Sequence, residues 1–129
     1  MGRSKRSQKM NVKPLILTVN SNVRNLELLN QFLSREGYQT FNASGLEEFN
    51  RAMSQAQINL GLIDITGFDS SIWKWCEQLQ NQQIPFLIIS PRQNAVIQNQ
   101  SLVCGARNIL IKPLVIKQLF ALIKSLLED

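Results

Sequence analysis

The sequence predicts an α/β fold in which helices cover both faces of a five-stranded parallel sheet. Five short strand-like runs alternate along the chain with five helical patterns, and the connections between them are short. The central run, Leu60 to Ile65, is apolar except for Asp64, as is typical of a strand buried on both faces. Crossovers that alternate in this way give a doubly wound parallel sheet.

Each expected strand is a short run rich in apolar or β-branched residues that ends at turn-forming residues. The expected strands are Leu15 to Val19, Tyr38 to Asn42, Leu60 to Ile65, Pro85 to Ile89 and Asn108 to Ile111. Asn20 to Asn22 ends the first strand and offers side chains that can cap a helix. Ser90-Pro91 ends the fourth strand, and Lys112-Pro113 ends the fifth.

The expected helices carry apolar side chains at helical spacing. Their buried stripes are Leu26, Leu29 and Leu33 in the first helix, Leu46, Phe49 and Met53 in the second, Ile72, Trp75, Cys76 and Leu79 in the third, and Leu119, Leu122, Ile123 and Leu126 in the last. Gly37 ends the first helix, and Ser44 to Glu47 has the capping-box pattern that begins the second. A fourth helix is expected from about Asn94 to Cys104, and Gly105 closes it.

The basic charge of the chain is concentrated at its N-terminus. Four of the 14 basic residues lie within the first nine positions, and the formal net charge of the whole chain is +5. We therefore expect residues 1–12 to be a basic, disordered tail and residues 13–129 to form one domain. A solvated tail is favoured over a docking arm for nucleic acid or anionic lipid, so neither a nucleic acid nor a membrane is an expected partner.

The composition is that of an ordinary globular protein, with 44% hydrophobic and 18% charged residues. No apolar run is long enough to span a membrane, and the N-terminus lacks the apolar core of a signal peptide. We therefore expect a cytoplasmic protein. Cys76 and Cys104 are isolated within helical patterns, which favours buried, reduced thiols over a disulfide or a metal site.

Polar residues follow four of the expected strands at the points where these strands end. They are Asn20, Ser21, Asp64, Ser90 and Lys112. The carboxyl ends of parallel strands share one edge of the sheet, where ligands bind in open α/β folds. A carboxylate there can act as a nucleophile toward a phosphoryl group, while a lysine and a hydroxyl neutralise and orient its oxygens. The alternative is that Asp64 is only the partner of a structural ion pair.

With these residues in order, the chain resembles the receiver domain of two-component response regulators from about Lys13 to Leu127. Asp64 matches the phospho-acceptor, Ser90 the Ser/Thr of the fourth strand, and Lys112-Pro113 the Lys-Pro pair after the fifth. The resemblance implies the flavodoxin-like (CheY-like) fold with strand order 2-1-3-4-5. It also implies a cis Lys112-Pro113 peptide and a direct pairing of Lys112 with Asp64.

Departures from the family pattern indicate an atypical receiver, or pseudo-receiver. Asn20 and Ser21 stand where receivers usually carry two acidic residues that help to bind Mg²⁺. Asp64 is then the only anionic ligand of the expected metal set Asp64, Asn20 and Ser21, so Mg²⁺ binding should be weak or absent. The usual Met-Pro and Asp-Gly signature is replaced by Gly67 to Ser71, and Ile109 occupies a switch position that is often aromatic.

The resulting hypothesis is a stand-alone signalling module, not an enzyme, that binds a protein partner while phosphorylation of Asp64 is impaired or absent. The partner would be a histidine kinase or a downstream effector, and a homodimer is a further option. The alternative is a working, Mg²⁺-dependent phospho-accepting receiver of a phosphorelay. A small flavodoxin-like cofactor binder is disfavoured, because the Asn20 to Asn25 loop lacks the glycine of a phosphate-binding loop.

The resemblance also points to a contact surface, because receivers commonly associate through the fourth helix, the fifth strand and the last helix. In this chain that surface comprises Arg107, Lys117, Phe120 and the exposed side of Asn94 to Gln100.

Overall fold

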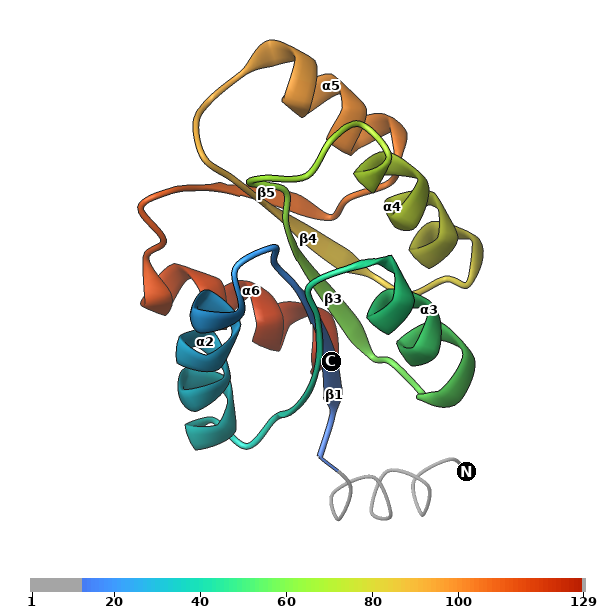
Figure 1. Ribbon diagram of the computed structural model, residues 1–129. Helices are drawn as coiled ribbons and strands as arrows, with labels where there is room; N and C mark the ends of the chain where they lie inside the picture. Colours follow the sequence, from blue (N-terminus) through green and yellow to red (C-terminus); the bar gives the residue numbers. More distant parts are fainter. Residues whose placement is uncertain (1–12, 129) are drawn as a thin grey trace, which may run out of the picture.

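Five strands form a parallel sheet in the order β2-β1-β3-β4-β5 in the computed structural model, which describes residues 13–128 (Figure 1). The strands are β1 (Leu15–Val19), β2 (Gln39–Ala43), β3 (Leu60–Asp64), β4 (Phe86–Ser90) and β5 (Asn108–Ile111). The predicted fold class and strand order are confirmed. The basic tail expected at residues 1–12 lies outside the described residues.

The two strands next to each other near the middle of the sheet, β3 and β4, are buried at every position. Their sequences, LGLID and FLIIS, are almost wholly apolar, because helices cover both of their faces. In the registers of the sheet, Asp64 lies opposite Ile89, and Ser90 lies opposite Ile111. The residues at and just after the ends of these strands therefore lie along one edge of the sheet.

Helices form the two outer layers of the fold. They are α2 (Val23–Arg35), α3 (Leu46–Gln55), α4 (Ile72–Asn81), α5 (Ala95–Val103) and α6 (Ile116–Leu127). Figure 1 shows α2 and α6 on one face of the sheet and α3, α4 and α5 on the other. Among residues 13–128, no helix combines the length and apolar character that crossing a membrane requires.

Two apolar cores result, one on each face of the sheet. Strand side chains alternate between faces, so Ile63 packs with the α3–α4 side while its neighbour Leu62 packs with the α6 side. On the first side, the Phe49 and Trp75 rings stack with their centroids 4.9 Å apart. This stack joins α3 to α4 over the sheet.

The start of α3 differs from the capping box predicted from the sequence. Gly45 is the N-cap residue, and the partner of Ser44 is Glu48 rather than Glu47. The Ser44 N–H and hydroxyl both donate to Glu48 Oε1, at 2.6 and 2.9 Å, and these bonds lower the pKa of Glu48. The helix therefore begins one residue later than expected. Leu46, predicted to be buried, is 51% exposed.

Both cysteines are buried free thiols, as predicted. Burial raises the pKa of Cys76 to about 12 and also raises the pKa of Cys104 above its ordinary value. The reactive species of cysteine is the thiolate, which is therefore scarce at neutral pH. Both thiols act here as small apolar core groups.

Phe49 and Leu46 provide a matched test of the packing on α3. We expect Phe49→Ala to lower the free energy of unfolding by about 3–5 kcal/mol, because it removes a fully buried ring that stacks on Trp75. Leu46→Ala on the same helix should change it by less than about 0.5 kcal/mol. Urea unfolding followed by circular dichroism measures both values, and equal losses in the two variants would contradict this packing.

Candidate functional site

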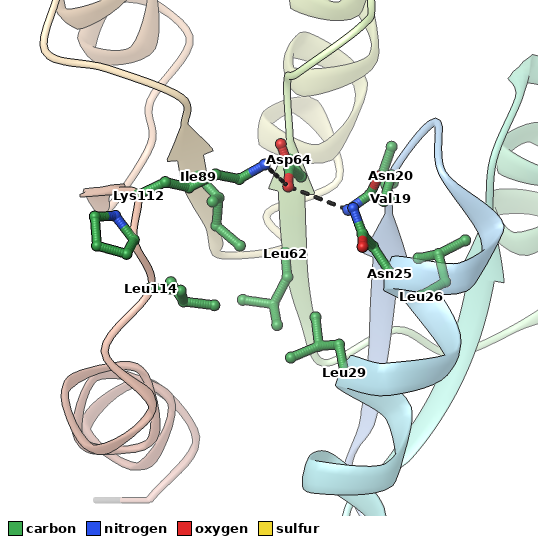
Figure 2. Close-up of a pocket in the computed structure, with 11 residues that line it drawn as sticks. Val19, Asn20, Asn25, Leu26, Leu29, Leu62, Asp64, Ile89, Lys112 and Leu114 are labelled. Atoms are coloured by element: carbon green, nitrogen blue, oxygen red, sulfur yellow. Dashed lines mark hydrogen bonds and ion pairs between the residues drawn. The ribbon is translucent and has the colours of Figure 1, made fainter.

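The candidate site lies at the carboxyl edge of the sheet, where the buried carboxylate of Asp64 meets the ammonium of Lys112. Asp64 is the last residue of β3, and Lys112 directly follows β5. The Lys112 Nζ atom lies 2.8 Å from Asp64 Oδ2, with side-chain exposures of 32% for Lys112 and 8% for Asp64. Figure 2 shows the Lys112 side chain reaching across Ile89 of β4 to this carboxylate. The predicted pairing of Lys112 with Asp64 is confirmed.

Two further donors complete the hydrogen bonding of Asp64. The Asn20 Nδ2 amide donates to Asp64 Oδ2 at 3.1 Å, and the backbone N–H of Thr66 donates to Asp64 Oδ1 at 3.0 Å. An unpaired carboxylate would be costly to bury at this depth. Here one cation balances the charge of the carboxylate, and each of its oxygens accepts at least one hydrogen bond from the protein.

Thr66 connects the parts of the site, although the sequence analysis did not single it out. Its backbone N–H binds Asp64, its hydroxyl accepts a hydrogen bond from Lys112 Nζ at 3.0 Å, and its carbonyl accepts one from Ser21 Oγ at 3.0 Å. The first of these contacts is the local turn that an aspartate commonly makes to the N–H two residues later. A hydroxyl residue two positions after a strand-end aspartate is thus the signal that could have identified it.

Asn20 and Ser21, the two residues expected to replace acidic metal ligands, are placed differently from one another. Asn20 is buried and presents its NH₂ group to Asp64, while its Oδ1 accepts a hydrogen bond from the Asn22 N–H at 2.9 Å. Ser21 is exposed and turns its hydroxyl to the Thr66 carbonyl. Of these two residues, only Asn20 contacts the carboxylate of Asp64.

The loop after β3 closes tightly over Ser21 through a glycine. Gly67 has φ +85°, and a Cβ atom at this position would lie 2.6 Å from Ser21 Oγ. Any larger residue here would suffer both backbone strain and a clash. The glycine at position 67 therefore allows the loop after β3 to pack closely against the loop after β1.

Ser90 and Asp69 do not contact Asp64. The Ser90 side chain is fully buried, and its hydroxyl donates to the Arg92 carbonyl at 2.7 Å. Asp69 is exposed, and its carboxylate accepts hydrogen bonds from the hydroxyl and the N–H of Ser71, which lower its pKa. Ser90 thus stabilises the turn after β4, and Asp69 stabilises the start of α4.

The residues at this edge do not match the donor set of a magnesium site. Mg²⁺ favours carboxylate oxygens in octahedral geometry. Asp64 is the only carboxylate of the site, Asn20 turns its NH₂ group toward it, and Ser21 is directed away. Throughout residues 13–128, no group of three or more Asp, Glu, His and Cys side chains is arranged to hold a metal ion.

The Lys112-Pro113 peptide is cis, as predicted. The last helix begins only at Ile116, with Val115 as its N-cap. Leu114 therefore belongs to the loop between β5 and α6. There it lines a pocket beside the Asp64 site, together with residues of α2 and the sheet.

The fold and this edge together define a receiver-type α/β module with a strand-end aspartate paired to a lysine. Residues 16–124 match the response regulator receiver domain family. The match covers most of the chain, and the protein belongs to that family, whose members are signalling modules.

Similar proteins agree with this assignment. The chain is 28% identical over 117 residues to the transcriptional regulatory protein GltR of Pseudomonas aeruginosa, covering 88% of this chain and 48% of that protein. It spans about half the length of the curated relatives that it matches.

Solved structures share the fold. A two-component response regulator from Clostridium difficile has a TM-score of 0.83 at 24% identity, with 91% of this chain and 98% of that chain covered. A CheY-like receiver domain protein from Methanospirillum hungatei JF-1 has a TM-score of 0.81 at 24% identity, with coverages of 90% and 94%.

The ion pair predicts an asymmetric response to mutation. We expect Lys112→Met to destabilise the protein by about 1–3 kcal/mol, because it leaves the buried Asp64 carboxylate without its cation. The loss should not be larger, because Lys112 is partly exposed and water screens its charge. Asp64→Asn should cost less, because the ammonium of Lys112 can turn toward water. Urea unfolding of both single variants and the double variant measures the coupling between them. Additive losses would show that the two groups do not interact.

Proposed function

We propose that this receiver works as a protein-binding signalling module in which phosphorylation of Asp64 is impaired or absent. The observation that supports this proposal is that the carboxylate of Asp64 already has a cation and two hydrogen-bond donors. Lys112, Asn20 and the Thr66 N–H together compensate its carboxylate, so no metal ion is needed to relieve repulsion at the site.

Phosphoryl transfer to a carboxylate requires cationic groups that neutralise the phosphoryl oxygens as the new bond forms. In the described part of the chain, Lys112 is the cation that contacts Asp64, so without a metal ion it alone would neutralise the phosphoryl oxygens. The Ser90 hydroxyl would have to leave the Arg92 carbonyl before it could donate to a phosphoryl oxygen. Both features disfavour the reaction relative to a site with three carboxylates and a bound metal ion.

A working, Mg²⁺-dependent receiver is the second candidate. It is favoured by the position of Asp64 at the end of a buried strand with a lysine ammonium 2.8 Å away, since these two groups are the nucleophile and the charge-stabilising group of such a reaction. In this case Asn20 would turn its amide oxygen toward the metal ion, and water molecules would supply the other ligands.

Incubation with acetyl phosphate separates these two candidates. Intact-mass spectrometry should show little or no phosphorylated protein, and adding Mg²⁺ should not increase the amount. Asp64→Asn serves as the control for modification elsewhere. Rapid phosphorylation that requires both Mg²⁺ and Asp64 would reject the impaired receiver and establish the working one.

Variants at Asn20 and Ser21 test the reason for weak metal binding. Asn20→Asp should raise Mg²⁺ affinity by at least about tenfold, because it sets a second carboxylate beside Asp64. Ser21→Asp should raise it much less, because Ser21 is exposed and its hydroxyl faces the Thr66 carbonyl. Isothermal titration calorimetry measures both affinities. An equal increase in Mg²⁺ affinity in the two variants would mean that the contact of Asn20 with Asp64 gives it no advantage over Ser21 as a metal-ligand position.

We further propose that protein contacts use the surface of α5, β5 and α6. Helix α5 is unusual because its buried residue is Ser101, while Val96, Leu102 and Val103 are 68%, 66% and 80% exposed. Ile111 of β5 and Val115 before α6 are also exposed. Because exposed apolar patches mark protein-binding sites, we assign the contact to these three elements.

Self-association provides a direct test of this surface. Sedimentation equilibrium should detect a concentration-dependent dimer that Val103→Glu weakens by at least about tenfold, because a charge in an apolar contact remains unpaired. Leu28→Glu, on the exposed side of α2, is the matched control and should not change the association. A dimer that is sensitive only to Leu28→Glu would assign the contact to another surface.

A further inference from the structure

A pocket of about 300 Å³ lies directly beside the Asp64–Lys112 pair, between α2 and the loop that joins β5 to α6. Its apolar part is formed mainly by Leu29 of α2, Leu62 of β3, Ile89 of β4 and Leu114 of the loop. Figure 2 shows Leu29 and Leu114 approaching from opposite sides, with Leu62 between them. The volume is at the lower end of the range for small-molecule sites.

The polar end of the pocket is formed by Asn20, Asn25, Asp64 and Lys112. The ion pair cancels the formal charge here, so this end offers hydrogen bonds but no net charge. Lys112 has three N–H donors, of which Asp64 and Thr66 occupy two. The Asn25 side chain, which also lines the pocket, carries an amide that can both donate and accept.

We propose that this pocket binds a small, uncharged, amphipathic molecule. Its apolar body lies between Leu29 and Leu114, and its hydrogen-bonding head meets Lys112 and Asn25. A charged head group would lose its hydration at the mouth of a mostly apolar pocket and gain no unpaired counter-charge in return. The inference goes beyond the proposed function, because binding of such a molecule requires no phosphoryl transfer to Asp64.

Three probes with one six-carbon chain and different heads test the proposal: hexanamide, hexanoate and hexylammonium. The backbone amide NMR spectrum of the protein is recorded during titration with each probe. We expect hexanamide to shift the resonances around Leu26, Leu29 and Leu114 saturably, with a low-millimolar dissociation constant for a ligand of this size. Hexanoate and hexylammonium should each bind at least about fivefold more weakly.

A pocket-filling variant and a matched control locate the site. Leu29→Trp places a larger ring in the pocket and should weaken hexanamide binding at least about fivefold. Leu28→Trp, at the adjacent exposed position of the same helix, should leave the affinity unchanged. If Leu29→Trp does not give the spectrum of a folded protein, Leu114→Trp fills the pocket from the opposite side.

Several results would overturn the proposal. The absence of saturable shifts with hexanamide, or shifts away from these residues, would reject the pocket as a ligand site. A charged probe that binds as tightly as hexanamide would reject the uncharged head. Shifts of the same resonances upon dilution without any probe would assign this surface to a second copy of the chain instead.

Discussion

The ion pair between Asp64 and Lys112 is the interaction on which the rest of this site depends. The parallel sheet places a carboxylate at the end of its buried strand β3, where its side chain is only 8% exposed. Such a group persists as a charge only beside a cation and hydrogen-bond donors. Lys112, entering from the end of β5, supplies the charge, and Asn20 and Thr66 supply the donors. The charge of Asp64 is thus balanced by Lys112, and each of its carboxylate oxygens accepts at least one hydrogen bond.

The α/β fold and the placement of Asp64 and Lys112 at one edge were predictable from long-range regularities, whereas the strand order and the direct pairing of the two side chains were implied by the family resemblance. Strand and helix periods fix the alternating pattern, and parallel crossovers bring Asp64 and Lys112 to one edge. Local hydrogen bonding was less predictable. The capping partner of Ser44 is Glu48 rather than Glu47, Thr66 was overlooked, and the bond of the Ser90 hydroxyl to the Arg92 carbonyl had no sequence signal. Each of these contacts depends on the conformation of a loop, and a shift of one residue or a change of one side-chain rotamer would give a different hydrogen-bond partner.

Lys112 links the site to two other regions of the molecule. It follows β5 directly, and the loop that contains it continues through Leu114 to α6. The same loop forms one side of the pocket, and β5 and α6 contribute to the surface proposed for protein contacts. A change in the Asp64–Lys112 pair therefore acts on a segment that belongs to all three regions.

The central claim is that Asp64 is neutralised by Lys112 rather than by a metal ion. Carbon-detected NMR of the Asp64 side-chain carboxyl resonance during a Mg²⁺ titration tests it most directly, with Asn20→Asp as the metal-binding reference. The resonance of the natural sequence should stay unchanged through millimolar Mg²⁺, while that of the reference should shift saturably. A saturable shift of the natural Asp64 resonance at submillimolar Mg²⁺ would contradict the claim, because it would show that a cation readily takes the place of Lys112.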